Sequence, residues 1–162
     1  MNILYLHGLE SKLNEAKRVR LQKYGKVFAP NIDYHNIPNA IEWVLEKYAD
    51  TKFGAVIGSS MGGFAGYYIS NSLDLPALLF NPALNSRSTF QQVPELNPAA
   101  SAFKQLVIGQ RDSIVRPADT LSFLGEYLDG KTELFLHLRS EMEHRVPLDC
   151  LEQELKTFFK RI

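Results

Sequence analysis

The residues best suited to chemistry form the stretch Gly58–Gly63, which reads Gly-Ser-Ser-Met-Gly-Gly. An apolar, strand-like run (53–57) precedes it and a helix-like run (64–73) follows it. A Gly-x-Ser-x-Gly motif between a strand and a helix is typical of a sharp turn that exposes the central serine hydroxyl. The following helix aims free N–H groups and its dipole at the same point. We therefore predict that Ser60 is a nucleophile that attacks an acyl carbon, whereas Ser59 occupies the wrong position of the motif.

Two later residues could activate this serine, because its hydroxyl needs a base and the base needs an acid to fix its tautomer. Asp112 follows the strand-like run 105–109, and His144 lies in a polar loop after the strand-like run 133–138. The carboxyl ends of parallel strands meet at one edge of a sheet, where open α/β sheets build their sites. We expect His144 to be the base and Asp112 the acid.

Backbone N–H groups that could stabilise an oxyanion are expected at two places. One is Met61, the residue after the nucleophile. The other is Leu9, because the run 3–6 reads as a strand and Gly8 in the following loop lets the backbone approach a ligand closely. His7 opens this loop, and we expect it either to make a structural hydrogen bond or, with Gly8, to contact the substrate.

Several stretches spread along nearly the whole chain resemble those of the compact bacterial YqiA-like esterases, which are small α/β-hydrolases. These stretches are Tyr5–Ser11, Gly58–Gly63, Asn81–Ala83, Gly109–Asp112 and Glu143–Arg145. The resemblance implies the α/β-hydrolase fold and a triad made by Ser60, Asp112 and His144. The chain departs from the family at Leu9, where an aromatic residue is usual, and in the loop before His144. These departures concern the preferred substrate more than the type of catalysis.

Strand-like and helix-like runs alternate along the chain, which predicts βαβ units and a mainly parallel sheet. Strands are expected at 3–6, 26–29, 55–57, 77–80, 106–108 and 133–138. Helices are expected within 11–24, 38–48, 64–73, 117–128 and 147–160. We therefore predict one compact α/β-hydrolase domain over residues 1–162, with about six strands and helices on both faces of the sheet.

The connection 85–101 interrupts this alternation and contains two prolines. It is too short for a substantial lid, and we expect one helical turn at 88–91 and a shallow, open pocket. Further residues expected at the pocket, besides those of the loop after the first strand, are Phe90 and Val115. Arginines in nearby loops could favour an anionic substrate or simply be solvated: Arg87, Arg111 and Arg116.

Composition excludes several classes of protein. The 18 Lys and Arg residues balance the 18 Asp and Glu residues, which argues against nucleic acid and anionic membranes as partners. No run approaches the roughly 20 apolar residues of a membrane span. The single cysteine, Cys150, cannot form an internal disulfide, and residues 1–6 lack the features of a signal peptide. We therefore expect a cytoplasmic protein, and the sequence leaves its oligomeric state open.

Nucleotide and metal sites are poorly supported. A phosphate-binding loop would need Lys followed by Ser or Thr where the chain has Phe64 and Ala65. No second group of ligands accompanies Glu141, Glu143 and His144, so no metal or other cofactor is expected.

The leading hypothesis is thus a serine hydrolase that acts on a small acyl ester or thioester, with acyl transfer and perhydrolysis left open. The rival hypothesis is a binding module on the same scaffold, since a fold does not fix a function.

Overall fold

A six-stranded parallel sheet forms the centre of the protein in a computed structural model that describes residues 1–162. Its strands are β1 (Asn2–Leu6), β2 (Lys26–Phe28), β3 (Ala55–Ser59), β4 (Ala77–Phe80), β5 (Lys104–Gly109) and β6 (Leu134–Arg139). They lie in the order β2-β1-β3-β4-β5-β6, and every neighbouring pair is parallel. The prediction of about six mainly parallel strands is confirmed.

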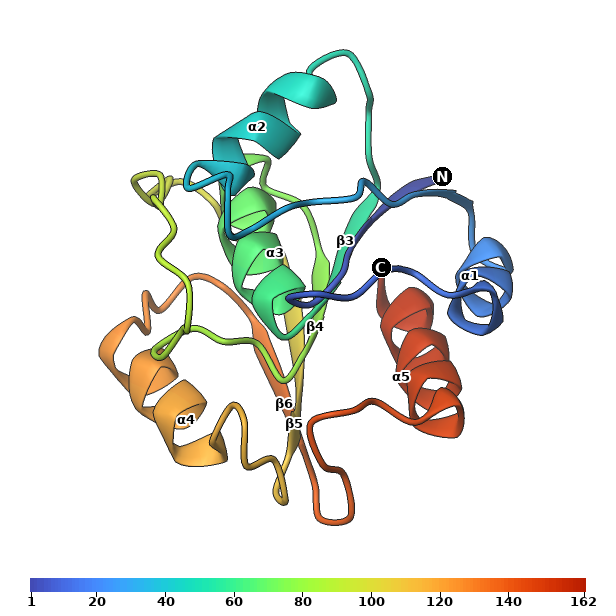
Figure 1. Cartoon of the computed structure of the whole chain (residues 1–162), viewed down its shortest axis with the longest axis vertical. Helices are drawn as coiled ribbons and strands as arrows, with labels where there is room; N and C mark the ends of the chain where they lie inside the picture. Colours follow the sequence, from blue (N-terminus) through green and yellow to red (C-terminus); the bar gives the residue numbers. More distant parts are fainter.

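Helices cover both faces of the sheet (Figure 1). The helices are α1 (Glu15–Gln22), α2 (Ala40–Lys47), α3 (Met61–Ser72), α4 (Pro117–Glu126) and α5 (Leu148–Arg161). Side chains alternate along a strand, so Leu4 and Leu6 of β1 join a core with α2, α3 and α4. Ile3 and Tyr5 of the same strand point the other way and join a core with α1 and α5. Two apolar layers therefore hold the sheet rigid between the helices.

The strand order reverses direction between β1 and β3, because β2 lies on one side of β1 and all later strands lie on the other. Leu6, the last residue of β1, is in register with Gly58 of β3. Ligands of open α/β sheets bind beyond the carboxyl ends of the strands at such a reversal. The loop after β1 and the turn after β3 therefore meet at the place where a site is expected.

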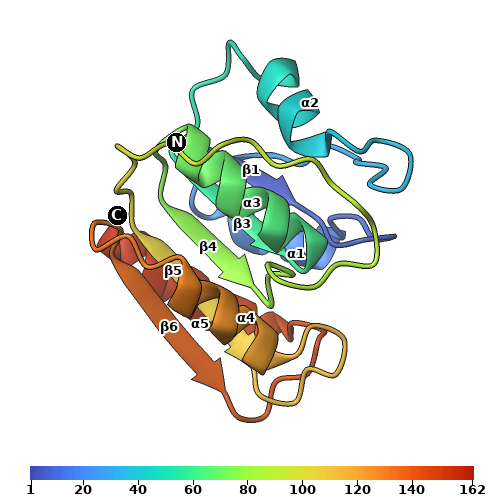
Figure 2. The same ribbon diagram turned by 90° about the vertical axis from the view of Figure 1, so that its left-hand side faces the viewer.

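The connection 85–101 contains bends and one hydrogen-bonded turn at 98–99, but no helical turn at 88–91, so the prediction of a helical turn there is wrong. The buried Gln91 explains the difference, because its amide donates to the carbonyls of Tyr34 (2.8 Å) and Ile37 (3.0 Å). Its Oε1 also accepts a bond from the N–H of Ala40 (3.2 Å). These long-range bonds hold the connection in an extended form beside α2 and α3 (Figure 2).

None of the five helices combines the length and the apolar character needed to span a membrane.

Candidate active site

Ser60 occupies a strained turn between β3, which ends at Ser59, and α3, which begins at Met61. Its φ of 56° and ψ of −118° are unfavourable for a residue with a side chain. The chain can turn this tightly because Gly58 and Gly62 lack a Cβ. A Cβ at Gly58 would overlap the carbonyl oxygen of Gly62, and one at Gly62 would overlap the carbonyl oxygen of Leu6. The motif thus builds the sharp strand-to-helix turn expected of it.

Asp112 and His144 are brought together beyond the neighbouring strands β5 and β6. His144 Nδ1 lies 2.7 Å from Asp112 Oδ2. The Asp112 side chain is fully buried (0% exposed), and its Oδ1 accepts bonds from the N–H groups of Ile114 (2.8 Å) and Val115 (2.9 Å). These bonds fix the carboxylate, which in turn orients the imidazole and leaves its Nε2 free.

Ser60 and His144 line one cavity of about 540 Å³. Gly8 and Leu9 of the loop after β1 line it as well, and a Cβ added to Gly8 would lie 3.3 Å from Cβ of Ser60. The N–H of Leu9 has no acceptor in the protein. Met61 is the first residue of α3, so its N–H has no acceptor within the helix. The cavity thus combines a hydroxyl, an imidazole and nearby N–H groups that are free to bind a ligand.

Asn81, which follows β4, connects the end of β5 to the loop that carries His144, and the sequence analysis assigns it no function. Its side-chain amide donates to the carbonyls of Glu143 (3.0 Å) and His144 (3.0 Å). Its Oδ1 accepts a bond from the N–H of Gly109 (2.7 Å), and its own φ is 41°. Asparagine tolerates this conformation better than most residues do. The Asn-Pro-Ala stretch was the only sequence signal for it.

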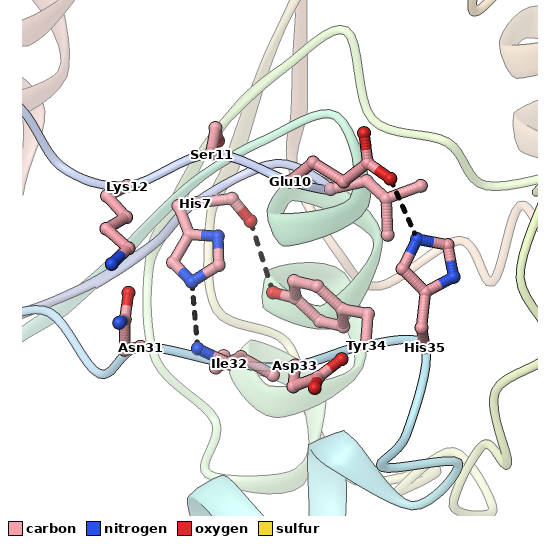
Figure 3. A pocket seen from close by; sticks show the side chains of 10 residues that line it. His7, Glu10, Ser11, Lys12, Asn31, Ile32, Asp33, Tyr34 and His35 are labelled. Carbon is pink, nitrogen blue, oxygen red and sulfur yellow. Dashed lines mark hydrogen bonds and ion pairs between the residues drawn. The ribbon is translucent and has the colours of Figure 1, made fainter.

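His7 lies in a neighbouring cavity of about 330 Å³ (Figure 3), which shares Leu9, Ser11 and Lys12 with the cavity of Ser60. Its Nε2 accepts a bond from the N–H of Ile32 (2.9 Å). The ring proton therefore sits on Nδ1, which donates to the carbonyl of Gly8 (2.7 Å). Burial lowers the pKa of His7, which favours the neutral ring that these bonds require. Of the two expectations for His7, the structure supports the structural hydrogen bond and does not bring it into the cavity of Ser60.

Neither Phe90 nor Val115 lines the cavity of Ser60. Phe90 is 74% exposed, and the Val115 side chain packs into the core beside α4. The three arginines expected near the rim do not line this cavity either, and Arg87 donates to the carbonyl of Leu84 (2.7 Å). Arg111 pairs with Glu141 (3.0 Å), and Arg116 pairs with Asp119 (2.8 Å).

No three His, Cys, Asp or Glu side chains gather in a way that could hold a metal ion.

Comparison with known proteins places the chain in a family. Residues 2–111 match the model of the uncharacterised protein family UPF0227. The match includes the loop after β1 and Ser60 and ends just before Asp112, so Asp112 and His144 both lie outside it. Because it spans well over half of the chain, it establishes membership, in agreement with the resemblance to YqiA-like esterases.

Solved structures share the fold at low sequence identity. Arabidopsis thaliana SOBER1 superposes with a TM-score of 0.69 at 16% identity, covering 99% of this chain and 98% of that one. Mouse alpha/beta hydrolase domain-containing protein 10 superposes with a TM-score of 0.69 at 14% identity, covering 99% of this chain and 90% of that one. Staphylococcus aureus FphF, a fluorophosphonate-binding serine hydrolase with substrate bound, superposes with a TM-score of 0.70 at 14% identity, covering 99% of this chain and 82% of that one. The chain therefore belongs to the UPF0227 family and has the α/β-hydrolase fold.

Proposed function

We propose that this protein is a serine hydrolase that cleaves small acyl esters or thioesters through a covalent acyl-enzyme. The observation that carries this proposal is the shared cavity of Ser60 and His144, with His144 Nδ1 held 2.7 Å from the buried Asp112 carboxylate. A strained serine, an imidazole and a buried acid are the parts that nucleophilic acyl chemistry needs.

In the first half of the reaction, Ser60 Oγ attacks the acyl carbon while His144 Nε2 accepts the hydroxyl proton. The N–H groups of Met61 and Leu9 stabilise the negative charge that develops on the carbonyl oxygen. The bond from the acyl carbon to the alcohol or thiol then breaks, and His144 returns the proton to this leaving group. Asp112 keeps the imidazole in the required tautomer and stabilises its cation.

In the second half, a water molecule attacks the acyl carbon bound to Ser60. His144 accepts a proton from this water and afterwards donates it to Ser60 Oγ as the acyl–oxygen bond breaks. The products are a carboxylic acid and the free enzyme.

A fluorophosphonate probe tests this assignment, because it reacts with activated serines. The name of FphF describes binding of such a reagent by a protein of the same fold. We expect covalent labelling of the wild-type protein at Ser60, found by peptide mass spectrometry. Ser60→Ala should abolish labelling and lower the hydrolysis of 4-nitrophenyl butyrate by about 10⁴-fold or more.

Ser59→Ala is the matched control, since Ser59 is the neighbouring hydroxyl and lines the same cavity. Labelling should persist in this variant. A wild-type protein that binds short esters but neither reacts with the probe nor turns them over would instead be a binding module. Labelling that survives in Ser60→Ala and disappears in Ser59→Ala would identify Ser59 as the nucleophile and refute the assignment to Ser60.

A further inference from the structure

The cavity of Ser60 is lined by three basic side chains and by no acidic one. The three are Lys12, Lys17 and Arg145. Lys17 lies in the first turn of α1, and Arg145 directly follows His144. The chain as a whole carries no net charge, so this accumulation of positive charge belongs to the cavity rather than to the protein in general.

Lys17 and Arg145 have no counter-ion among the ion pairs of the protein. On the same helix α1, by contrast, Arg20 and Lys23 both pair with Glu152. Burial lowers the pKa of Lys17, and the positive charge of Arg145 lowers it further. The two cations line the same cavity, and neither forms an ion pair with an acidic side chain there.

Lys12 is placed differently from the other two cations. Figure 3 shows its side chain extending toward Asn31 in the neighbouring cavity, which it also lines. Its charge helps to lower the pKa of His7, which lies in that same cavity. Lys12 is thus shared between the two cavities, whereas Lys17 and Arg145 line the cavity of Ser60 alone.

We propose that Lys17 and Arg145 bind an anionic group, a carboxylate or a phosphate, carried by the ester or thioester that Ser60 attacks. The inference rests on the proposed hydrolase function and adds the chemical class of its substrate. An anion between the two side chains would replace their repulsion by attraction in a partly desolvated space, where charges interact more strongly than in water. The guanidinium of Arg145 can also bind either kind of oxyanion with two parallel hydrogen bonds.

Matched substrates locate the charge. For an anion on the acyl side, the 4-nitrophenyl monoester of adipic acid is compared with its methyl ester. For a carboxylate on the leaving group, 4-butyryloxybenzoate is compared with its methyl ester. For a phosphate on the leaving group, 4-butyryloxyphenyl phosphate is compared with phenyl butyrate. Each kcat/KM is divided by the uncatalysed rate constant of the same ester, which removes differences in intrinsic reactivity. The measured quantity is the ratio of the anionic to the neutral member of each pair.

We expect this ratio to exceed about 10 in at least one pair and to fall as salt is added, because ions screen charges at the protein surface. Lys17→Gln and Arg145→Gln should each lower the ratio about tenfold, which corresponds to about 1.4 kcal/mol. The matched control is Lys160→Gln. It removes one positive charge near the end of α5, whose 14 residues extend about 20 Å away from the site. Its ratio should equal that of the wild-type protein.

The outcomes separate this inference from the proposed function. A ratio near 1 in every pair, with Ser60-dependent hydrolysis of the neutral esters, overturns the anion site and leaves the hydrolase intact. An equal fall of the ratio in Lys160→Gln also overturns it, because net charge alone would then explain the preference. If no ester in any pair is hydrolysed and the fluorophosphonate does not react, both proposals fail. The wild-type ratio and its salt dependence decide the question even where a variant folds poorly.

Discussion

Replacing Asn81 tests whether this residue positions His144. It is 1% exposed, does not line the cavity of Ser60, and makes three side-chain hydrogen bonds, one to the last residue of β5 and two to the loop after β6. Asn81→Gly removes all three bonds but permits the φ of 41°. Asn81→Ala removes the same bonds and adds backbone strain, so the two variants separate the two contributions.

The magnitudes follow from these contacts. Three hydrogen bonds at about 1 kcal/mol each give a loss of about 3 kcal/mol in the free energy of unfolding for Asn81→Gly. Asn81→Ala should lose about 1 kcal/mol more, because a left-handed conformation is costly for alanine. Both losses are smaller than the stability of a typical domain, which is about 5–15 kcal/mol, so both variants should fold. A displacement of His144 by about 1 Å would lower kcat by about 10²-fold and change KM much less.

Urea denaturation measures the stabilities, and hydrolysis of 4-nitrophenyl butyrate measures kcat and KM. Asn71→Ala is the control. It removes a buried asparagine of α3 whose Oδ1 accepts a bond from the N–H of Asn97 (2.7 Å), in a region with no contact to His144. It should lower the stability but leave kcat within about twofold. If Asn81→Gly loses the expected stability and keeps its kcat, Asn81 does not position the base.

Three further results are expected. The free energy of unfolding should fall by up to about 1.4 kcal/mol per pH unit as the pH drops below about 6.5. Burial lowers the pKa of His7 in the folded protein, so as the pH drops this histidine is protonated in the unfolded chain before it is protonated in the folded one. The free energy of unfolding measured with urea should therefore fall less with pH in His7→Gln than in the wild-type protein. Gly62→Ala should lower the free energy of unfolding, measured by thermal denaturation, by about 3 kcal/mol or more, because the added Cβ would overlap backbone oxygens. Gly125→Ala is the control, since its added Cβ meets no atom within 4 Å and the stability should stay near that of the wild-type protein. The kcat/KM for 4-nitrophenyl esters of two to sixteen carbons should level off after the first few carbons, because a methylene contributes about 0.8 kcal/mol only when it is buried; a steady rise would reveal an apolar channel.

Local sequence patterns were enough to predict the sheet and the turn at Ser60. The glycines of that turn are required by contacts within a few residues or to the adjacent strand, so their spacing carries the information. The positions of Asp112 and His144 beyond neighbouring strands followed from the alternation of elements, because parallel strands present their carboxyl ends at one edge.

Features that depend on distant contacts could not be predicted in this way. The conformation of the connection 85–101 depends on the bonds of Gln91 to residues more than 50 positions away. Lys17 lines the cavity only because of where α1 lies on the sheet, and nothing in the local sequence of that helix distinguishes it from Arg20 or Lys23. The contribution of Asn81 likewise appears only when the end of β5 and the loop after β6 are folded beside it.

The division of the site between the centre and the border of the sheet has a consequence for its dynamics. Ser60 is held by β3 and α3, which are almost entirely buried, whereas His144 follows β6, an edge strand whose side chains are partly exposed. Edge elements with few buried contacts open locally at a lower free energy than the core does. Brief detachment of β6 would therefore separate the imidazole from the hydroxyl while the rest of the molecule stays folded. Under mild denaturant, amide hydrogens of β6 should therefore exchange faster than those of the central strands, and turnover should be lost before the central strands unfold.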